Sequence, residues 1–152
     1  MPLILRGATP ADARELADVY LQSRHALASY APLVHTDAAV RRWIANVLIP
    51  SGAVTVAVCD GEIAGMAAHS VSNGVAWLDQ LYVSPRYKRQ GIGTALLESV
   101  KSQTALELQL YTFQMNHDAA AFYERHGFVA IAYSDGSRNE EGCPDVLYCL
   151  KR

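Results

Sequence analysis

The sequence predicts an α/β protein with a mixed β-sheet, and three observations lead to this fold class. Stretches of β-favouring residues alternate along the chain with stretches whose apolar residues recur at helical spacing, in the order β-α-α-β-β-β-α-β-α-β-β. Asp60-Gly61 and Asn73-Gly74 are typical two-residue hairpin turns, so they predict antiparallel neighbours in the middle of the chain. Around Gly91, a strand instead feeds a glycine loop that opens a helix.

The first third of the chain predicts a strand and two helical segments. Residues 3–5 are apolar, and the strand should end at Gly7. Thr9 is a typical N-cap with Pro10 at the first helical position, and the helix or helix pair should end near residues 30–32. Thr36 caps a second helix that Pro50-Ser51-Gly52 stops. We expect that helix to bury Val40, Trp43, Ile44, Val47 and Leu48.

The middle of the chain predicts three strands and a helix. Residues 53–59, 62–71 and 75–83 are the strands, and Ser84-Pro85 ends the third because proline cannot donate to a strand ladder. The helix after Gly91 has its apolar residues at helical spacing. These are Ile92, Leu96, Leu97 and Val100.

The last third predicts a strand at residues 107–111 and a short helix capped by Asn116, with Gly127 as its C-terminal stop. Two further strands, residues 128–133 and 146–150, flank a polar loop.

Composition limits the class of protein. A chain of 152 residues, 51% hydrophobic and 18% charged, predicts a single globular domain over residues 1–152. A formal charge of −2 argues against a general nucleic-acid binder, and no apolar run approaches a membrane span of about 18 residues. Three cysteines without a C-x-x-C spacing predict reduced thiols in a cytoplasmic protein. The histidines show no zinc-ligand spacing, so we expect no metal.

The loop before the central helix has the chemistry of an anion site. The first turn of a helix carries unpaired N–H groups and partial positive charge, and glycines allow a ligand close to the backbone. Lys88 and Arg89 add full charges, and Thr94 adds a hydroxyl. A Walker loop is excluded because no lysine follows Gly93, and a dinucleotide fingerprint lacks its third glycine because Leu96 stands there. A tight turn before a core helix is the structural alternative.

Two motifs carry a resemblance to the GCN5-related N-acetyltransferases, the GNAT family. The loop Lys88-Arg89-Gln90-Gly91-Ile92-Gly93 resembles that family's acyl-CoA motif [QR]-x-x-G-x-[GA], with lysine where glutamine or arginine is usual. Residues 116–128, N-H-D-A-A-A-F-Y-E-R-H-G-F, are similar to a second family segment, although an amphipathic helix with an Asn cap would also explain them. The order of elements matches the family over nearly the whole chain.

The resemblance implies transfer of an acetyl group from acetyl-CoA to a primary amine of a small molecule or peptide, by direct attack in a ternary complex. The sheet should be splayed between its fourth and fifth strands, with the pantetheine arm in the gap. Asn116 would bind that arm, and Tyr123 would protonate the departing sulfur. The backbone of the fourth strand would bind the arm at Leu81, Tyr82 and Val83. The pyrophosphate would lie beside Lys88, on N–H groups of Arg89, Gln90, Gly91, Ile92, Gly93 and Thr94.

The general base and the acceptor are less closely defined. Asp79 in the fourth strand is the candidate base, with Glu62 and His69 as weaker alternatives. Acceptor sites in the family come from the first two helices and the last hairpin loop, which makes Tyr30, Trp43 and Asp79 the candidate substrate-binding residues. Acidic residues in residues 134–145 suit a cation or form a solvated loop. The alternative function is a non-catalytic acyl-CoA-binding sensor or interaction module, and a homodimer stays open.

Overall fold

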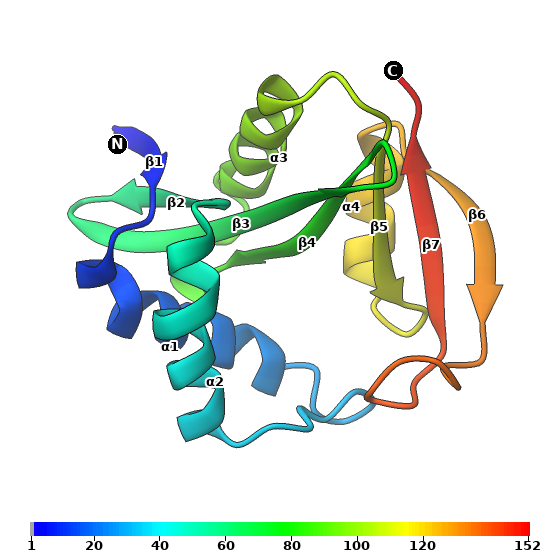
Figure 1. Ribbon diagram of the computed structural model, residues 1–152, viewed down its shortest axis with the longest axis horizontal. Coiled ribbons are helices and arrows are strands. Elements are labelled where there is room, and N and C mark those ends of the chain that lie inside the picture. The colour runs from blue at the N-terminus through cyan, green and yellow to red at the C-terminus, as the bar shows by residue number, and fades with distance from the viewer. Residues whose placement is uncertain (1) are drawn as a thin grey trace.

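The computed structural model describes residues 2–152 and contains one seven-stranded sheet in the order β1-β2-β3-β4-β5-β7-β6 (Figure 1). β4 and β5 are parallel, and all the other neighbouring pairs are antiparallel. The predicted order of helices and strands is confirmed. The strands are β1 (Leu3–Gly7), β2 (Val54–Cys59), β3 (Glu62–Ser72), β4 (Val75–Val83), β5 (Leu108–Phe113), β6 (Val129–Ser134) and β7 (Asp145–Leu150).

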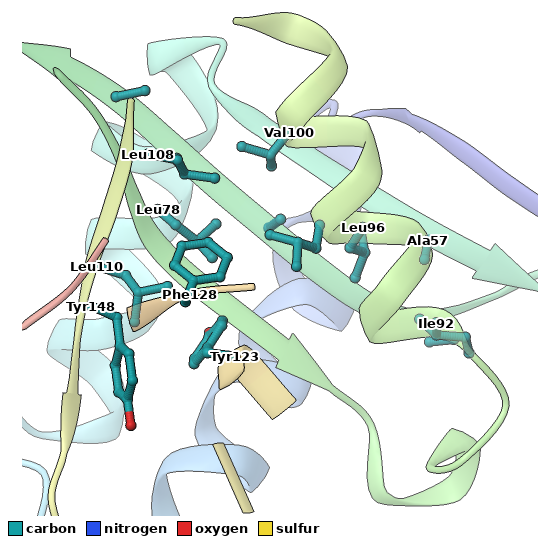
Figure 2. Packing of buried hydrophobic residues seen from close by; sticks show 14 of the residues in the cluster. Ala57, Leu78, Ile92, Leu96, Val100, Leu108, Leu110, Tyr123, Phe128 and Tyr148 are labelled. Carbon is teal, nitrogen blue, oxygen red and sulfur yellow. The ribbon is translucent and has the colours of Figure 1, made fainter. Parts of the chain in front are cut away.

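The helices bury two separate apolar clusters against the sheet. α1 (Ala13–His25) and α2 (Asp37–Trp43) pack on β2 and β3 from one side, whereas α3 (Ile92–Gln103) and α4 (His117–Arg125) enclose the second cluster. Figure 2 shows Leu96 and Val100 of α3 pointing toward Leu78 in β4. Within residues 2–152, no helix combines the length and the apolar character that crossing a membrane requires.

The second helical segment departs from the expected pattern of burial. Val40, Ile44 and Leu48 are buried as predicted and Trp43 is partly buried, but Val47 is 57% exposed, so its expected burial is wrong. The reason is a π-helical turn at Ile44–Leu48, which places more residues in one turn than an α-helix does. The turn rotates Val47 into solvent and brings Ile49 inward.

A bulge in β4 changes which side chains face which side of the sheet. The pairing with β3 steps from Ala68–Gln80 to His69–Leu78, so Asp79 is the extra residue. Leu78 belongs to the cluster under α3, whereas Tyr82 packs against the cluster under α1. In a regular strand, side chains four positions apart face the same side of the sheet, so Leu78 and Tyr82 would do so if β4 had no bulge. The bulge therefore shifts the alternation of side chains by one residue in the second half of β4.

The sheet opens between β4 and β5. In the described chain their register joins Ala76 to Leu108 and Trp77 to Gln109, at the beginning of both strands. Beyond these pairs the two strands diverge, as Figure 1 shows. The rest of β4 therefore presents backbone N–H and C=O groups on its β5 side that no strand uses, as the expected splay requires.

Candidate active site

A cleft of about 750 Å³ lies where the sheet opens. Its walls come from the end of β4, the loop that follows, the start of α3 and one side of α4. Nine of the sequence-predicted residues line it: Leu81, Val83, Lys88, Arg89, Gly91, Ile92, Gly93, Thr94 and Tyr123. Tyr82, Gln90 and Asn116 are not among its lining residues. The side chain of Tyr82 faces the other side of β4, because it packs with the α1 cluster.

The backbone at the start of α3 takes conformations that favour close approach of a ligand. Gly91 is the N-cap with φ of 78°, in the left-handed region, and Arg89 also has a positive φ of 64°. A Cβ atom on Gly93 would lie 3.3 Å from the Phe122 ring, so the start of α3 passes close to α4. The N–H groups of this first turn, which have no acceptor within the helix, lie at the cleft that residues 91–94 line.

The cleft is positively charged at the helix start. Lys88 and Arg89 line it as expected, and Arg125 of α4 adds a third cation that sequence reasoning missed. Its guanidinium carbon is 5.8 Å from the centre of the Phe122 ring. Basic residues are common in the last turn of a helix, because they interact favourably with the helix dipole. Only the packing of α4 beside α3 therefore reveals that Arg125 faces the cleft.

Asn116 caps α4: its Oδ1 accepts a hydrogen bond from the backbone N–H of Ala119, at 3.2 Å. The side-chain amide nitrogen of Asn116 remains a donor, because the cap uses only the oxygen.

Tyr123 lies both in the core and at the cleft. Its side chain packs against Phe122, Phe128 and Tyr148, with ring centroids 5.2, 5.5 and 6.2 Å away, and the residue is 8% exposed (Figure 2). Burial raises the pKa of the Tyr123 phenol well above its ordinary value. The hydroxyl is therefore protonated at neutral pH and can act as a donor.

The candidate bases lie away from the larger cleft. Asp79 is exposed at the bulge and lines neither this cleft nor the smaller cavity on the other side of β4. Glu62 accepts a hydrogen bond from the hydroxyl of Tyr87 at 2.7 Å and pairs with Arg86, so it holds the loop after β4. The Tyr87 hydroxyl lowers the pKa of Glu62. His69 pairs with Leu78 in the sheet and also lines neither cavity.

A second cavity of about 370 Å³ lies on the α1 and α2 side of β4. Trp43 lines it as expected, whereas Tyr30 does not, and Tyr20 and Gln80 are lining residues that sequence reasoning missed. The other lining residues are His35, Ala39, Val40 and Glu140. The amphipathic pattern of α1 explains the burial of Tyr20 but does not reveal that its ring borders a cavity.

Tyr82 lies between the two cavities. Its ring meets Tyr20 edge-on, with centroids 5.2 Å apart, while its chain neighbours Leu81 and Val83 line the larger cleft. Burial raises the pKa of Tyr82 well above its ordinary value. The second half of β4 therefore separates a cationic cleft from an aromatic cavity.

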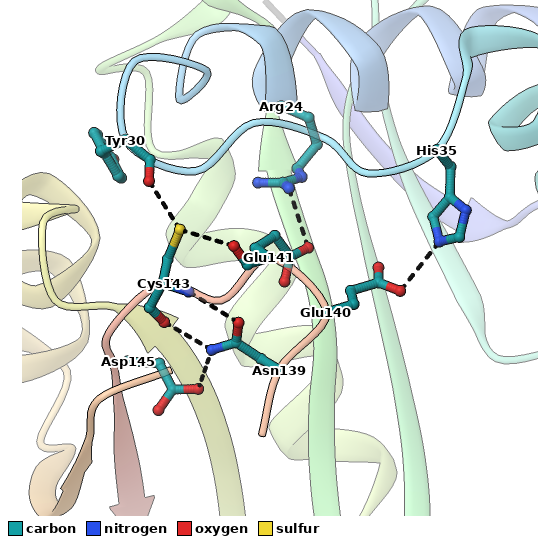
Figure 3. A network of polar contacts seen from close by, with 8 residues as sticks. All are labelled: Arg24, Tyr30, His35, Asn139, Glu140, Glu141, Cys143 and Asp145. Atoms are coloured by element: carbon teal, nitrogen blue, oxygen red, sulfur yellow. Dashed lines mark hydrogen bonds and ion pairs between the residues drawn. The ribbon is translucent and has the colours of Figure 1, made fainter. Parts of the chain in front are cut away.

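Two loops meet at the second cavity, and each contributes polar contacts (Figure 3). His35 Nε2 lies 3.1 Å from Glu140 Oε2, and the thiol of Cys143 donates to the carbonyl of Tyr30 at 2.9 Å. The connection between α1 and α2 is thereby tied to the loop between β6 and β7, as the adjacent blue and orange segments in Figure 1 show.

A sheet parted between two parallel strands, with cationic side chains at the helix start beside the gap, is the arrangement expected of an acyl-CoA-dependent transferase. The family model described as "Acetyltransferase (GNAT) family" matches residues 20–128, which is more than half of the chain, and the protein belongs to that family. It is accordingly an acetyl-CoA-dependent N-acetyltransferase.

Relatives and solved structures agree with this assignment. The chain is 27% identical over 133 residues to the uncharacterized N-acetyltransferase YafP of Escherichia coli K12, covering 84% of this chain and 81% of that protein. The fold is similar to PaiA N-acetyltransferase from Thermoplasma acidophilum in complex with coenzyme A, with TM-score 0.74, 23% identity and full coverage of both chains. It is also similar to Arabidopsis thaliana Naa50 bound to the bisubstrate analogue CoA-Ac-MVNAL, with TM-score 0.74, 20% identity and full coverage of both chains.

Proposed function

We propose that the protein acetylates a primary amine of a small molecule or peptide by direct attack on acetyl-CoA in a ternary complex. The observation that carries this proposal is the pair of cavities on either side of β4, with Tyr123 at the larger one and Tyr82 between them. The donor would occupy the larger, cationic cleft and the acceptor the smaller, aromatic cavity. The thioester and the amine would then meet at the opening between β4 and β5.

The larger cleft fits acetyl-CoA in shape and charge. Its volume is in the usual range for ligand sites, and Lys88, Arg89 and Arg125 complement phosphate groups. The N–H groups from Arg89 to Thr94 would bind the pyrophosphate. Free peptide groups of β4 at Leu81, Tyr82 and Val83 would pair with the amides of the pantetheine arm. The free amide nitrogen of Asn116 would donate to that arm.

Tyr123 would act as the general acid. The acceptor nitrogen attacks the thioester carbonyl carbon, an N–C bond forms, and the C–S bond breaks. The departing sulfur takes the phenol proton of Tyr123, and solvent then restores that proton. A buried, protonated phenol that borders the cleft supports this role.

The proton of the attacking amine needs a separate acceptor, because an alkylamine is mostly protonated near pH 7. Asp79 would take it through water, since its neighbour Gln80 lines the acceptor cavity. Glu140 is the carboxylate that lines that cavity itself, so it is the competing candidate. Replacing each separately distinguishes the two.

The test is thiol release from acetyl-CoA across a panel of amines, amino acids and peptides, with binding of acetyl-CoA measured in parallel. We expect at least one amine to give thiol and an acetylated product in equal amounts. If acetyl-CoA bound and no acceptor released thiol, the sensor alternative would be favoured. If it did not bind, the cleft would be misassigned.

A further inference from the structure

We propose that the acceptor is a small α-amino acid, whose carboxylate binds Arg24 and whose side chain enters the aromatic cavity beside Tyr20 and Trp43. The proposal rests on the acetyl transfer proposed above and adds the class of acceptor.

Arg24 is a buried cation whose donors are only partly used. It lies in the last turn of α1, is 3% exposed, and donates through Nη2 to Glu141 Oε2 at 3.3 Å. Its Nη1 atom is buried, and among residues 2–152 it has no hydrogen-bond partner. A guanidinium offers five N–H donors and binds carboxylates best through two parallel bonds. A buried donor without an acceptor costs free energy, so this nitrogen is suited to a ligand oxygen.

Arg24 lies beside the second cavity without lining it, because it pairs with Glu141, the chain neighbour of the lining residue Glu140. Its guanidinium carbon is 5.4 Å from the centre of the ring of Phe113, the last residue of β5. The charge of Arg24 also acts on the phenols of Tyr20 and Tyr82, lowering the pKa of each against the larger opposing effect of burial. Tyr20 lines the acceptor cavity, and Tyr82 lies between the cavities. A carboxylate bound to Arg24 would therefore lie on the same side of β4 as Tyr20 and the second cavity.

The charges around Arg24 complement a zwitterion. Glu141 pairs with Arg24, and the adjoining Glu140 lines the cavity and pairs with His35 (Figure 3). An incoming ammonium group would find Glu140, while the incoming carboxylate would find Nη1 of Arg24. An amine without a carboxylate would leave that nitrogen unpaired. The hydrogen bond from Nη1 to a carboxylate should therefore make the protein prefer an amino acid over the corresponding simple amine.

The loops above the cavity favour a small acceptor over a peptide chain. The contacts His35–Glu140 and Cys143–Tyr30 join the two loops, and Arg24–Glu141 adds a third tie from α1 (Figure 3). A peptide threaded between the loops would have to break these contacts. A volume of about 370 Å³ is near the lower end of the range for small-molecule sites. The tyrosine and tryptophan walls suit an apolar or aromatic side chain.

The experiment compares amino acids with the amines that differ from them only by the carboxylate. Thiol release is measured with L-phenylalanine, L-phenylalaninamide and 2-phenylethylamine, and with L-leucine and 3-methylbutylamine. We expect kcat/KM to be at least about tenfold higher for one of the amino acids than for its amine, with the amide in between.

The double variant Arg24→Met/Glu141→Gln removes both charges, so that no buried carboxylate is left unpaired. We expect the ratio between amino acid and amine to fall toward one, chiefly through a higher KM for the amino acid. The matched control is Arg41→Met/Asp18→Asn, which removes an exposed ion pair of 2.6 Å between α1 and α2. The control should keep the wild-type ratio.

Equal rates for amino acid and amine in the wild-type protein, or a preference for the amine, would overturn the inference while leaving acetyl transfer intact. A preference that survives in a folded Arg24→Met/Glu141→Gln variant would remove Arg24 from recognition. If none of these five compounds released thiol although acetyl-CoA bound, this inference would be contradicted, whereas the proposed function would be contradicted only if the wider panel of amines and peptides also gave no thiol. The wild-type comparison needs no variant, so a double variant that fails to fold does not decide the question.

Discussion

The phenol of Tyr123 is packed against three aromatic rings and also borders the larger cleft. The ring of Tyr123 can therefore stabilise the core while its hydroxyl takes part in catalysis. Burial excludes water from the ring and keeps the phenol protonated, which is the state that a proton donor to sulfur needs. The two roles differ in what loss of the hydroxyl alone would do.

We predict that Tyr123→Phe lowers kcat by roughly 10²-fold and leaves acetyl-CoA affinity nearly unchanged, because the change removes only the hydroxyl that we propose as the general acid. Steady-state kinetics and ligand titration measure the two effects. Tyr148→Phe is the matched control, since the Tyr148 hydroxyl donates to Glu124 at 2.7 Å and Tyr148 does not line the cleft. The control should lose about 1 kcal/mol of stability and keep kcat. A folded Tyr123→Phe protein with wild-type single-turnover rates would exclude the phenol from the chemical step.

Asp79 and Glu140 are separated by a second comparison. If Asp79 takes the amine proton, Asp79→Asn should lower the rate most at low pH, where the acceptor amine is most fully protonated and depends most on a base. Glu140→Gln should then affect chiefly KM. The measurement is kcat/KM against pH for both variants. A pH profile that changes only in Glu140→Gln would assign the proton transfer to the cavity carboxylate instead.

At the level of elements, the start of α3 depends on a backbone conformation that side chains disfavour. Gly91 and Gly52 both have left-handed φ angles, of 78° and 76°, and a Cβ atom would contact nothing within 4 Å at either position. Gly91 lines the larger cleft, whereas Gly52 ends the helical segment after α2 and does not. A side chain at either position would introduce similar backbone strain, but only the position of Gly91 lies at the cleft.

We predict that Gly91→Ala weakens acetyl-CoA binding by at least about tenfold, because it distorts or covers the N–H groups that would bind the pyrophosphate. Gly52→Ala should cost a similar amount of stability, about 1 kcal/mol, and leave binding unchanged. Calorimetric titration and thermal unfolding measure both proteins. Equal affinity in both variants would mean that the loop has been misread.

The start of α1 is tied to β1 by Asp12, which accepts two hydrogen bonds from Arg6, at 2.8 and 3.0 Å, and one from the N–H of Thr9. Chiefly through the Arg6 hydrogen bonds, the pKa of Asp12 is lowered to about 2. The unfolded chain therefore binds this proton at higher pH than the folded protein does. The resulting stabilisation is complete above about pH 4 and is lost as the pH falls through about 2.

We predict that Asp12→Asn lowers the free energy of unfolding by about 1 kcal/mol at neutral pH, after allowance for the solvent exposure of Arg6. The difference from wild type should shrink between about pH 4 and pH 2. Urea unfolding across this range measures it. Glu98→Gln, at an exposed pair with Lys101, should run parallel to wild type. A deficit for Asp12→Asn that stays constant down to pH 2 would contradict the assignment.

At the scale of the whole molecule, the opening between β4 and β5 places two cavities on opposite sides of one strand. The end of β4 pairs with β3 but not with β5, so a ligand that bridges the opening should stabilise the folded state. Backbone N–H and C=O groups of β4 that lack a partner strand would form hydrogen bonds with the bound ligand.

We predict that acetyl-CoA, without added metal, raises the melting temperature, and that the stabilisation increases with the logarithm of its concentration above Kd. A concentration one hundred times Kd should contribute about 2.7 kcal/mol by mass action. Differential scanning fluorimetry with acetyl-CoA, and with acetate as a control, measures the shift. An unchanged melting temperature at millimolar acetyl-CoA would contradict the donor assignment.

The sequence by itself determined the order of elements, the hairpins and the glycine loop, because these depend on local periodicity, turn chemistry and helix caps. It also identified nine residues that the fold brings to one cleft. Those residues lie in two contiguous motifs, so their proximity follows from only one packing contact, α3 against α4.

Tertiary structure alone decided the rest. The extra residue at Asp79 re-phased β4, and the π-helical turn exposed Val47, because each shift of one residue is invisible in hydrophobic periodicity. The second cavity joins Tyr20, Gln80 and Glu140 from three distant segments. Arg24 belongs to an ordinary helix end in the sequence, and only packing removes it from water and leaves its Nη1 atom without a hydrogen-bond partner among residues 2–152. Local sequence determines which conformations a segment prefers, whereas burial and proximity between distant segments depend on how the whole chain packs.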